Sequence, residues 1–318
     1  MIRLENGKDS EVMDLKQLKY FLCLAREGNV TRAARQLNIV QPALSMQIAK
    51  LEGSVGRQLF FRSAHGMSLT PAGETLARLA TSILQNVDHA KEEMARLDGR
   101  ISGRVSIGMI TSAAQSTLAT SSAKIAAQYP EIQLLVCEGY TETLLEWVTT
   151  GQLDIAIVNV PSGKQNLIAH HILDEEMMLA RGPKNTTTLP NVVPYRRLKD
   201  FGLVLPSRRH GLRRILDAAA TDSQITLMPR LEIDTLSAVC EVVATTDLIT
   251  VLPGIALYQD LAEGRIEAYR LRKPAIIRSV AWLTHPRRAI SAAMSAVMEV
   301  LTEDLQRAAT SASRLVNR

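Results

Sequence analysis

The apolar pattern of the chain changes near residue 100, and this change limits the folds that it can adopt. Before that point, apolar residues recur mainly every three or four positions, which is the spacing of amphipathic helices. Beyond it, short apolar runs alternate with helical patterns, so strands and helices should follow one another. The segment 99–104, with Gly99 and Gly103, is predicted to be a hinge. We therefore expect an α/β chain whose 318 residues form at least two domains.

Three short helices are predicted near the start of the chain, because apolar residues recur there at helical spacing over 15–25, 31–37 and 42–55. Thr31 is expected to cap the second helix, and Pro42 to stand in the first turn of the third. Opposite its apolar stripe, the third helix carries small and polar groups, which suit entry into a major groove about 12 Å wide. Two short helices joined by a tight turn predict a helix-turn-helix.

Two short apolar runs follow, 59–62 and 67–69, and they predict a two-stranded wing. Arg62 ends the first run and is expected to face DNA phosphates. The stretch 13–71 carries eight basic and three acidic residues, so its net charge equals the +5 of the whole chain. We therefore predict a winged helix-turn-helix DNA-binding domain over 13–71, preceded by a flexible extension over 1–12.

A long helix is predicted over 72–98, with Thr70 as its cap and Pro71 in its first turn. Its apolar residues are spaced alternately by four and three positions and are Leu76, Ala80, Ile83, Val87, Ala90, Met94 and Leu97. Such a seam is typical of a two-helix coiled coil, so this helix is predicted to join two copies of the chain. The alternative is an amphipathic helix that lies on its own domain.

The second domain, over 105–306, is predicted from alternating strands and helices. The expected elements of its first half are strands 105–110, 132–138 and 153–158 and helices 113–129 and 141–150. This order implies a parallel sheet covered on both faces. The alternation is repeated over 203–252, and a strand at 278–283 and a helix at 289–305 follow, with a tail over 307–318. Two lobes of this kind leave a cleft at strand ends, where open sheets bind ligands.

The three cysteines, Cys23, Cys137 and Cys240, lie far apart in apolar stretches. This placement favours buried thiols in a reducing compartment over disulfides, with a redox switch as the alternative. No apolar run reaches the roughly 18 residues that a membrane span needs, and the N-terminus lacks the apolar core of a signal peptide. We therefore expect a cytoplasmic protein without a membrane partner.

The chain resembles the LysR-type family of bacterial transcriptional regulators from residue 13 to about 305. The residues that carry this resemblance are Leu18-Lys19-Tyr20-Phe21, Gly28-Asn29-Val30-Thr31-Arg32-Ala33-Ala34, Gln41-Pro42-Ala43-Leu44-Ser45, Leu51-Glu52 and Leu69-Thr70-Pro71-Ala72-Gly73. Three further segments are similar to the nitrogen-assimilation control subgroup, namely Gly103-Arg104-Val105-Ser106-Ile107-Gly108, Gly151-Gln152-Leu153-Asp154 and Leu205-Pro206-Ser207.

The resemblance implies a long linker helix and a two-lobed effector domain like that of periplasmic binding proteins. It also implies double-stranded promoter DNA, a small-molecule effector, further copies of the chain in a homodimer or homotetramer, and RNA polymerase as partners. The subgroup resemblance allows a second possibility, namely a regulator whose activity is set by its abundance.

The resemblance also places a set of residues at the DNA. These residues are Thr31, Arg32, Gln41, Pro42, Ala43, Ser45, Met46, Lys50 and Arg62. Met46 departs from the family pattern, in which a polar or basic residue is common just after the matched Ser45. Because a thioether cannot make bidentate contacts with bases, we expect only apolar contact there, for example with a thymine methyl.

Six residues at predicted helix starts form a candidate effector site, and they are Ser112, Thr141, Ser207, Arg208, Asp234 and Thr235. Helix N-termini offer unpaired N–H groups to an anion, and Arg208 adds a positive charge, so we expect a small organic anion. Ser112 and Gln115 also fit a capping box. Structural caps are therefore the alternative reading of the hydroxyl and carboxylate residues, and a solvated surface is the alternative for Arg208.

Two other classes of protein compete with a regulator. A solute-binding transport protein shares the two-lobed fold, but the helix-turn-helix pattern and the missing signal peptide argue against it. Enzyme chemistry has no support, because the sequence has no nucleophile elbow, phosphate-binding loop or dinucleotide glycine pattern. His170 and His171 are adjacent, so on a strand they point to opposite faces. We therefore expect no catalytic site, no cofactor and no metal.

Overall fold

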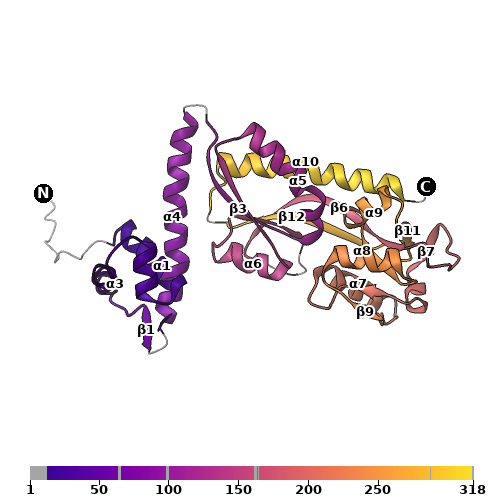
Figure 1. The fold of residues 1–318 in the computed structure, drawn as a ribbon, viewed down its shortest axis with the longest axis horizontal. Helices are drawn as coiled ribbons and strands as arrows, with labels where there is room; N and C mark the ends of the chain where they lie inside the picture. Colours follow the sequence, from indigo (N-terminus) through magenta and orange to yellow (C-terminus); the bar gives the residue numbers. More distant parts are fainter. Residues whose placement is uncertain are drawn as a thin grey trace, which may run out of the picture. The chain divides into compact units, whose positions relative to one another are not determined.

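The computed structural model describes residues 13–63, 66–97, 100–160, 163, 165–286 and 288–316. The chain divides into two compact units, Met1–Lys91 and Glu92–Arg318, which are treated separately below (Figure 1). The predicted extension over 1–12 lies outside the described residues. Within the described residues, no helix combines the length and the apolar character needed to cross a membrane.

The N-terminal unit contains the predicted helices and wing. Its first elements are α1 Leu15–Glu27, α2 Val30–Gln36, α3 Gln41–Val55, β1 Phe60–Ser63 and β2 Gly66–Leu69. Phe21, Leu44 and Phe60 are buried in the shared core, where the rings of Phe21 and Phe60 lie 5.3 Å apart. The wing is tied to α1 because the Met67 N–H donates to the Gly28 carbonyl at 2.8 Å. This unit therefore has the predicted winged helix-turn-helix arrangement.

The cap of α2 differs from the prediction. Asn29 is the N-cap, and its side-chain oxygen accepts from the N–H groups of Thr31 and Arg32 at 2.9 and 3.0 Å. Asparagine ranks among the strongest N-cap residues, so Asn29 occupies the N-cap position that was predicted for Thr31. The prediction that Thr31 is the cap was wrong, and its hydroxyl instead donates to the Gln41 side chain at 3.2 Å.

The helix α4 Pro71–Leu97 begins as predicted, since the Gly73 N–H donates to the Thr70 hydroxyl at 3.0 Å. Its seam has two different environments. Leu76 and Ala80 are buried in the core of the N-terminal unit, and Ile83 packs against the same core. Further along, Ala90 is exposed and the Met94 side chain is 63% exposed. The first part of the seam thus lies on its own domain, whereas Ala90 and Met94 in the later part are exposed.

Substitution by alanine should change the stability of this unit in opposite directions at two helical glycines, Gly53 and Gly73. A Cβ at Gly73 would lie 2.2 Å from the Leu59 carbonyl oxygen, whereas a Cβ at Gly53 would meet nothing within 4 Å. We expect Gly53→Ala to stabilise the N-terminal unit by about 0.5–1 kcal/mol through helix propensity. Gly73→Ala should destabilise it by about 1–3 kcal/mol, because backbone must move. Calorimetric unfolding of the full chain would measure both, and equal effects would contradict the close approach of α4 to Leu59.

The central sheet of the C-terminal unit is mixed rather than parallel. β3 Gly103–Met109 pairs in parallel with β4 Ile132–Glu138 and with β5 Ile155–Asn159, as predicted. The returning strand, β12 Ile277–Thr284, is antiparallel to β5 and to the long β6 Ile168–Arg181. The expectation of a parallel sheet is therefore confirmed for β3, β4 and β5, while β6 and β12, for which no direction was predicted, make the whole sheet mixed. Gly103 and Arg104 of the predicted hinge already belong to β3.

The two lobes share the strand β6. Its first part pairs with β12 over Ile168–Glu176, and its last part pairs with β10 and β11. The remaining strands are β7 Val192–Pro194, β8 Val204–Leu205, β9 Leu231–Glu232, β10 Ile249–Pro253 and β11 Glu267–Arg272. The remaining helices are α5 Thr111–Gln128, α6 Thr141–Thr149, η1 Tyr195–Asp200, α7 Gly211–Asp222, α8 Leu236–Thr245, α9 Gly254–Ala262 and α10 Ala292–Leu315. Each lobe has its own apolar core.

The closing helix α10 is longer than predicted. It was expected to end at Leu305, with a tail over 307–318, yet it continues to Leu315 (Figure 1). Ala312 is fully buried, and a Cβ at Gly254 would lie 3.2 Å from its methyl group. Because α10 packs on α9 through such small residues, the tail prediction was wrong for the described residues 307–316.

Candidate DNA interface and effector site

The DNA-binding candidates on α3 share one face. Leu44, Ile48 and Leu51 are buried on the opposite side of this helix. Gln41, Pro42, Ser45, Met46 and Lys50 are exposed, and Ala43 is half-buried. Small and polar side chains thus project from a helix whose other side is fixed by the core, as a recognition helix requires.

The wing and the start of α3 border one groove of about 430 Å³, lined in part by Asn29, Thr31, Gln41, Ser45 and Arg62. Arg62 lies exposed on β1 and is therefore placed to reach a phosphate beside the groove. The predicted wing residue Arg62 thus lines the same groove as the predicted helix residues Gln41 and Ser45.

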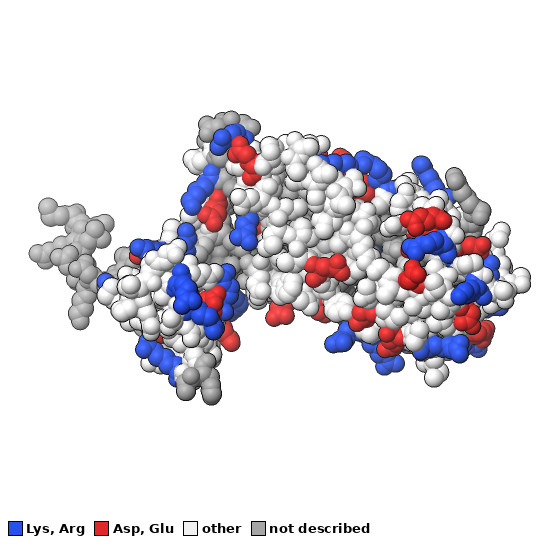
Figure 2. Space-filling model, viewed as in Figure 1, with Lys and Arg blue, Asp and Glu red and all other residues white. Residues whose placement is uncertain are grey.

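Arg32, a predicted DNA contact, also contacts Glu27 within the N-terminal unit. Its guanidinium donates to the Glu27 carbonyl, and its Nε lies 3.5 Å from a Glu27 carboxylate oxygen. The side chain is nonetheless 64% exposed. Basic side chains also gather over the N-terminal helices on the face drawn in Figure 2. The surface charge is thus positive on balance, as the sequence of 13–71 predicts.

Neither Ser112 nor Thr141 caps its helix. The N-caps of α5 and α6 are Ile110 and Tyr140, and neither cap side chain makes a capping hydrogen bond. The capping alternative for Ser112 and Thr141 was therefore wrong. Both side chains are buried, at 2% and 3% exposure. Their hydroxyls consequently lie inside the domain, at helix starts whose first N–H groups have no side-chain acceptor.

A buried arginine that sequence reasoning missed holds Ser112. The Arg278 guanidinium, on β12, donates to the Ser112 hydroxyl at 2.8 Å and to the Asn159 side-chain oxygen at 3.2 Å. Its Nε and Nη2 both donate to one Glu175 oxygen, at 2.9 and 2.7 Å. The second Glu175 oxygen accepts from the Ile255 N–H at the start of α9, at 2.6 Å. One buried ion pair therefore connects α5, β5, β6 and α9.

Thr141 lies beside the same cluster. A Cβ added at Gly211 would be 3.0 Å from the Asn159 amide nitrogen and 3.4 Å from the Thr141 hydroxyl oxygen. The start of α7 in one lobe therefore faces α6 and β5 of the other. The Thr141 hydroxyl has no hydrogen-bond partner among the described residues, although it is buried. A buried polar group without a partner costs free energy, and a ligand can supply the missing bond.

Asp234, which holds Ser207 within its own lobe, forms a bridge to Tyr140 of the other lobe. The Asp234 carboxylate accepts from the Ser207 N–H at 2.8 Å, from the Ser207 hydroxyl at 3.1 Å and from the Tyr140 hydroxyl at 2.8 Å. Burial alone would raise the pKa of Asp234, but these donors outweigh it and lower that pKa. Asp234 is thus a structural acceptor, and Tyr140 reaches it from the opposite lobe. Glu142 on α6 and Arg214 on α7 form a second bridge.

The segment 207–211 does not bring its charges to the cluster. Arg208 is exposed, and its side chain makes no hydrogen bond or ion pair with any residue that the structure describes. Thr235 is also exposed and occupies the N-cap of α8 without a side-chain bond. His210 is buried, its Nδ1 accepts from the Leu212 N–H, and burial lowers its pKa. The positive charge beside Ser112 therefore comes from Arg278 instead.

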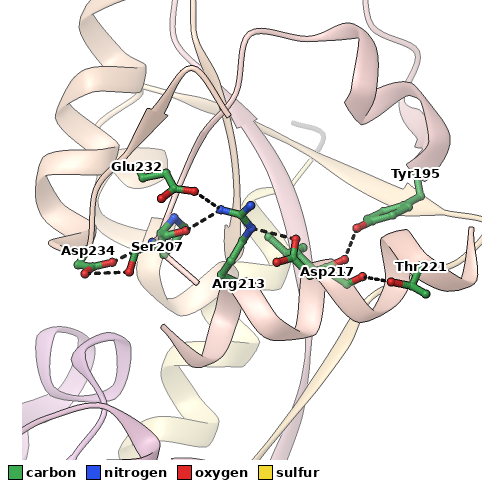
Figure 3. Close-up of polar contacts among 9 residues, drawn as sticks. Tyr195, Ser207, Arg213, Asp217, Thr221, Glu232 and Asp234 are labelled. Atoms are coloured by element: carbon green, nitrogen blue, oxygen red, sulfur yellow. Dashed lines mark hydrogen bonds and ion pairs between the residues drawn. The ribbon is translucent and has the colours of Figure 1, made fainter. Parts of the chain in front are cut away.

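Arg213 fixes the strand ends that carry Ser207 and Asp234. Figure 3 shows its guanidinium between Glu232 and Asp217, and its nitrogens lie 2.8 and 2.9 Å from the oxygens of these two carboxylates. The same guanidinium donates to the Pro206 carbonyl at 3.2 Å. Because Arg213 is only 1% exposed, this network holds the Pro206–Ser207 segment close to β9.

The cluster combines hydroxyl, amide and guanidinium groups that come from different helices and strands. The described residues contain no group of three His, Cys, Asp or Glu side chains placed to hold a metal. What the structure brings together is Ser112, Thr141, Asn159 and Arg278, with two helix starts. Asn159 and Arg278 carried no distinctive sequence signal, since each stands in a strand among apolar residues and their meeting depends on the β5–β12 pairing.

Comparisons with known proteins agree with this architecture. The family described as "Bacterial regulatory helix-turn-helix protein, lysR family" matches residues 15–74, and "LysR substrate binding domain" matches residues 98–306. The HTH-type transcriptional regulator BbuR of Bordetella bronchiseptica is 30% identical over 87% of this chain and 85% of that protein. The nitrogen assimilation regulatory protein nac of Escherichia coli is 28% identical over 91% of this chain and 94% of that protein.

A full-length OxyR variant from Pseudomonas aeruginosa has the same fold, with a TM-score of 0.71, 23% identity and coverage of 93% of this chain and 95% of that one. The nac protein is among the relatives, in line with the subgroup resemblance of the sequence, and BbuR is similar to the same degree. Both relatives are named as regulatory proteins. The chain belongs to the LysR family of bacterial DNA-binding transcriptional regulators and carries the substrate-binding domain of that family.

Proposed function

We propose that this protein is a cytoplasmic regulator that binds promoter DNA through α3 and the wing and senses a small organic anion in its C-terminal unit. The exposed face of α3, with Gln41, Ser45 and Met46, supports base contacts, and Arg62 supports phosphate contacts. RNA polymerase would then be the protein partner that reads the change in promoter occupancy.

The observation that carries the anion proposal is the buried, unpartnered hydroxyl of Thr141. It lies next to the start of α7, and the starts of α5 and α6 have no side-chain caps. Uncapped helix N-termini attract anions through their N–H groups and the helix dipole. Arg278, whose charge is balanced by Glu175, orients the Ser112 hydroxyl and the Asn159 side chain beside these helix starts. We therefore centre the effector site on Ser112, Thr141, Asn159 and Arg278, with Ser207 and Asp234 as its frame.

A thermal-shift screen over small organic anions, followed by calorimetric titration of each stabilising compound, tests this proposal. Thr141→Val removes the hydroxyl at nearly constant shape. We expect it to leave the unliganded protein as stable as before and to weaken anion binding about ten-fold. Thr149→Val is the matched control, because Thr149 lies at the other end of α6 and donates to the Leu145 carbonyl. Equal affinity in Thr141→Val and wild type would refute the site.

We also propose that two copies of the chain associate through the later part of α4. Ala90 and Met94 continue the seam there and are exposed in the single chain. Val87→Glu with Met94→Glu should place two charges in the interface and convert the dimer to monomers at micromolar concentration. Arg78→Glu changes the net charge by the same amount on an exposed position outside the seam, so it should leave the dimer intact. Light scattering that finds the double variant still dimeric would rule out the seam.

A further inference from the structure

A second groove, of about 510 Å³, lies where the last turns of α10 pass along β6. Volumes of this size are typical of small-molecule sites. The groove follows β6 because the Gln306 side chain donates to the Ile172 carbonyl at 2.9 Å, while Ala312 and Met178 both lie near Gly254. The lining of the groove therefore extends along β6 from Ile172 to Met178.

Opposite charges occupy the two ends of this groove. Asp174 lies toward the Ile172 end, and hydrogen bonds from Ser279 and His171 lower the pKa of its carboxyl, which therefore stays ionised at neutral pH. Arg270 is the register partner of Met178 at the other end, and Arg314 in the last turn of α10 also lines the groove.

The spacing of these charges follows from the strand. Arg270 reaches back along β6, and its Nη1 lies 2.8 Å from a Glu176 oxygen. Asp174 and Glu176 are two residues apart, which is about 7 Å along a strand. Leu173, Met178 and Ala309 add apolar lining to the same groove, and Glu176 lines it between Asp174 and Met178. The groove thus combines carboxylates, apolar side chains and guanidinium groups within reach of one small molecule.

We propose that this groove is a second small-molecule site, distinct from the Thr141 cluster, and that it takes a zwitterion of the amino-acid class. The ammonium group of the ligand pairs with Asp174, and its carbon chain covers the apolar lining. Its carboxylate pairs with Arg314, because Arg270 is already held by Glu176. Glu175 also borders the groove while it holds Arg278, so a bound ligand lies against the buried ion pair that supports Ser112.

The probe is 6-aminohexanoate, in which an extended carbon chain separates the two charges. In calorimetric titration of the full chain, we expect binding near 1 mM, which corresponds to about −4 kcal/mol. Hexanoate and hexylamine each keep one charge, and both should bind at least about ten-fold more weakly. Ser313→Trp fills the groove from an exposed position and should abolish binding without disturbing the core.

Charge variants locate the probe within the groove. Asp174→Asn and Arg314→Gln should each weaken 6-aminohexanoate binding about five-fold or more. Glu303→Gln and Arg307→Gln make matched charge changes on α10 outside the groove and should leave the affinity unchanged. Thr141→Val should also leave it unchanged, which separates this site from the proposed effector cluster. The proposal would be overturned if wild type showed no binding at a 6-aminohexanoate concentration 10-fold above the expected dissociation constant. Equal affinity of Ser313→Trp and wild type for this probe would also overturn it.

Discussion

Replacing Arg278 with methionine should lower the free energy of unfolding by about 3–5 kcal/mol, because the variant leaves a buried carboxylate without its counter-ion. The Glu175 side chain is only 5% exposed and takes both remaining guanidinium bonds on one oxygen. Water cannot replace the lost partner at such a site. Denaturant unfolding of the full chain, followed by circular dichroism, measures the change.

Arg213 provides a matched control for this prediction. It is as deeply buried as Arg278, at 1% exposure, and it also pairs with carboxylates. Its partners, Asp217 and Glu232, are 38% and 46% exposed, so water can solvate them when the arginine is removed. We therefore expect Arg213→Met to cost clearly less than Arg278→Met. A second test is the pair replacement, Arg278→Met with Glu175→Gln, which should recover part of the loss. Equal losses in the two single variants would contradict the role given to the buried Glu175.

The N-terminal unit could be predicted because its structure follows from local pattern. The spacing of Leu44, Ile48 and Leu51 sets the face of α3 that is buried, and the position of Pro42 sets the start of that helix. The exact caps were harder. Asn29 and Thr31 are both good N-cap residues two positions apart, and only the backbone at Asn29 decides between them.

The C-terminal unit was less predictable, because its key features depend on long-range pairing. The strand β6 contains His170, His171, Asp174, Glu175 and Glu176, so the first part of this central strand lacks an uninterrupted apolar run. These polar residues are accommodated by partners from β12, such as Arg278 for Glu175 and Ser279 for Asp174. Sequence spacing cannot reveal such pairs, since Glu175 and Arg278 are 103 positions apart.

The effector candidates illustrate the same limit. Ser112 and Thr141 were found from their places at helix starts, and the structure puts both beside Asn159. Arg208 was chosen for its charge, yet it is exposed and the buried Arg278 stands next to Ser112 instead. The place of a residue at the start of a helix after a strand therefore predicted the members of this cluster better than the positive charge of Arg208 did.

The division of labour between α3 and the wing predicts two different kinds of DNA-binding defect. Arg62→Ala should weaken binding to all sequences to a similar extent, because a phosphate contact carries no base information. Ser45→Ala should instead change the preference among half-sites, because Ser45 lies on the exposed face of α3. Arg57→Ala removes the same charge from an exposed position between α3 and β1 and is the matched control for Arg62. Identical profiles for the Arg62 and Ser45 variants would contradict the separate roles.

The most direct test of the proposed DNA-binding function is the salt dependence of binding to DNA from upstream of its own gene, measured by fluorescence anisotropy with the full-length protein. A regulator that neutralises several phosphates per dimer releases bound counter-ions, so its affinity falls steeply as salt rises. We expect the affinity to fall roughly 10³-fold or more between about 50 and 200 mM salt, with a shallower slope for Arg62→Ala. An affinity that barely changes over this range, or an Arg62→Ala slope equal to that of wild type, would contradict the interface built from α3 and the wing.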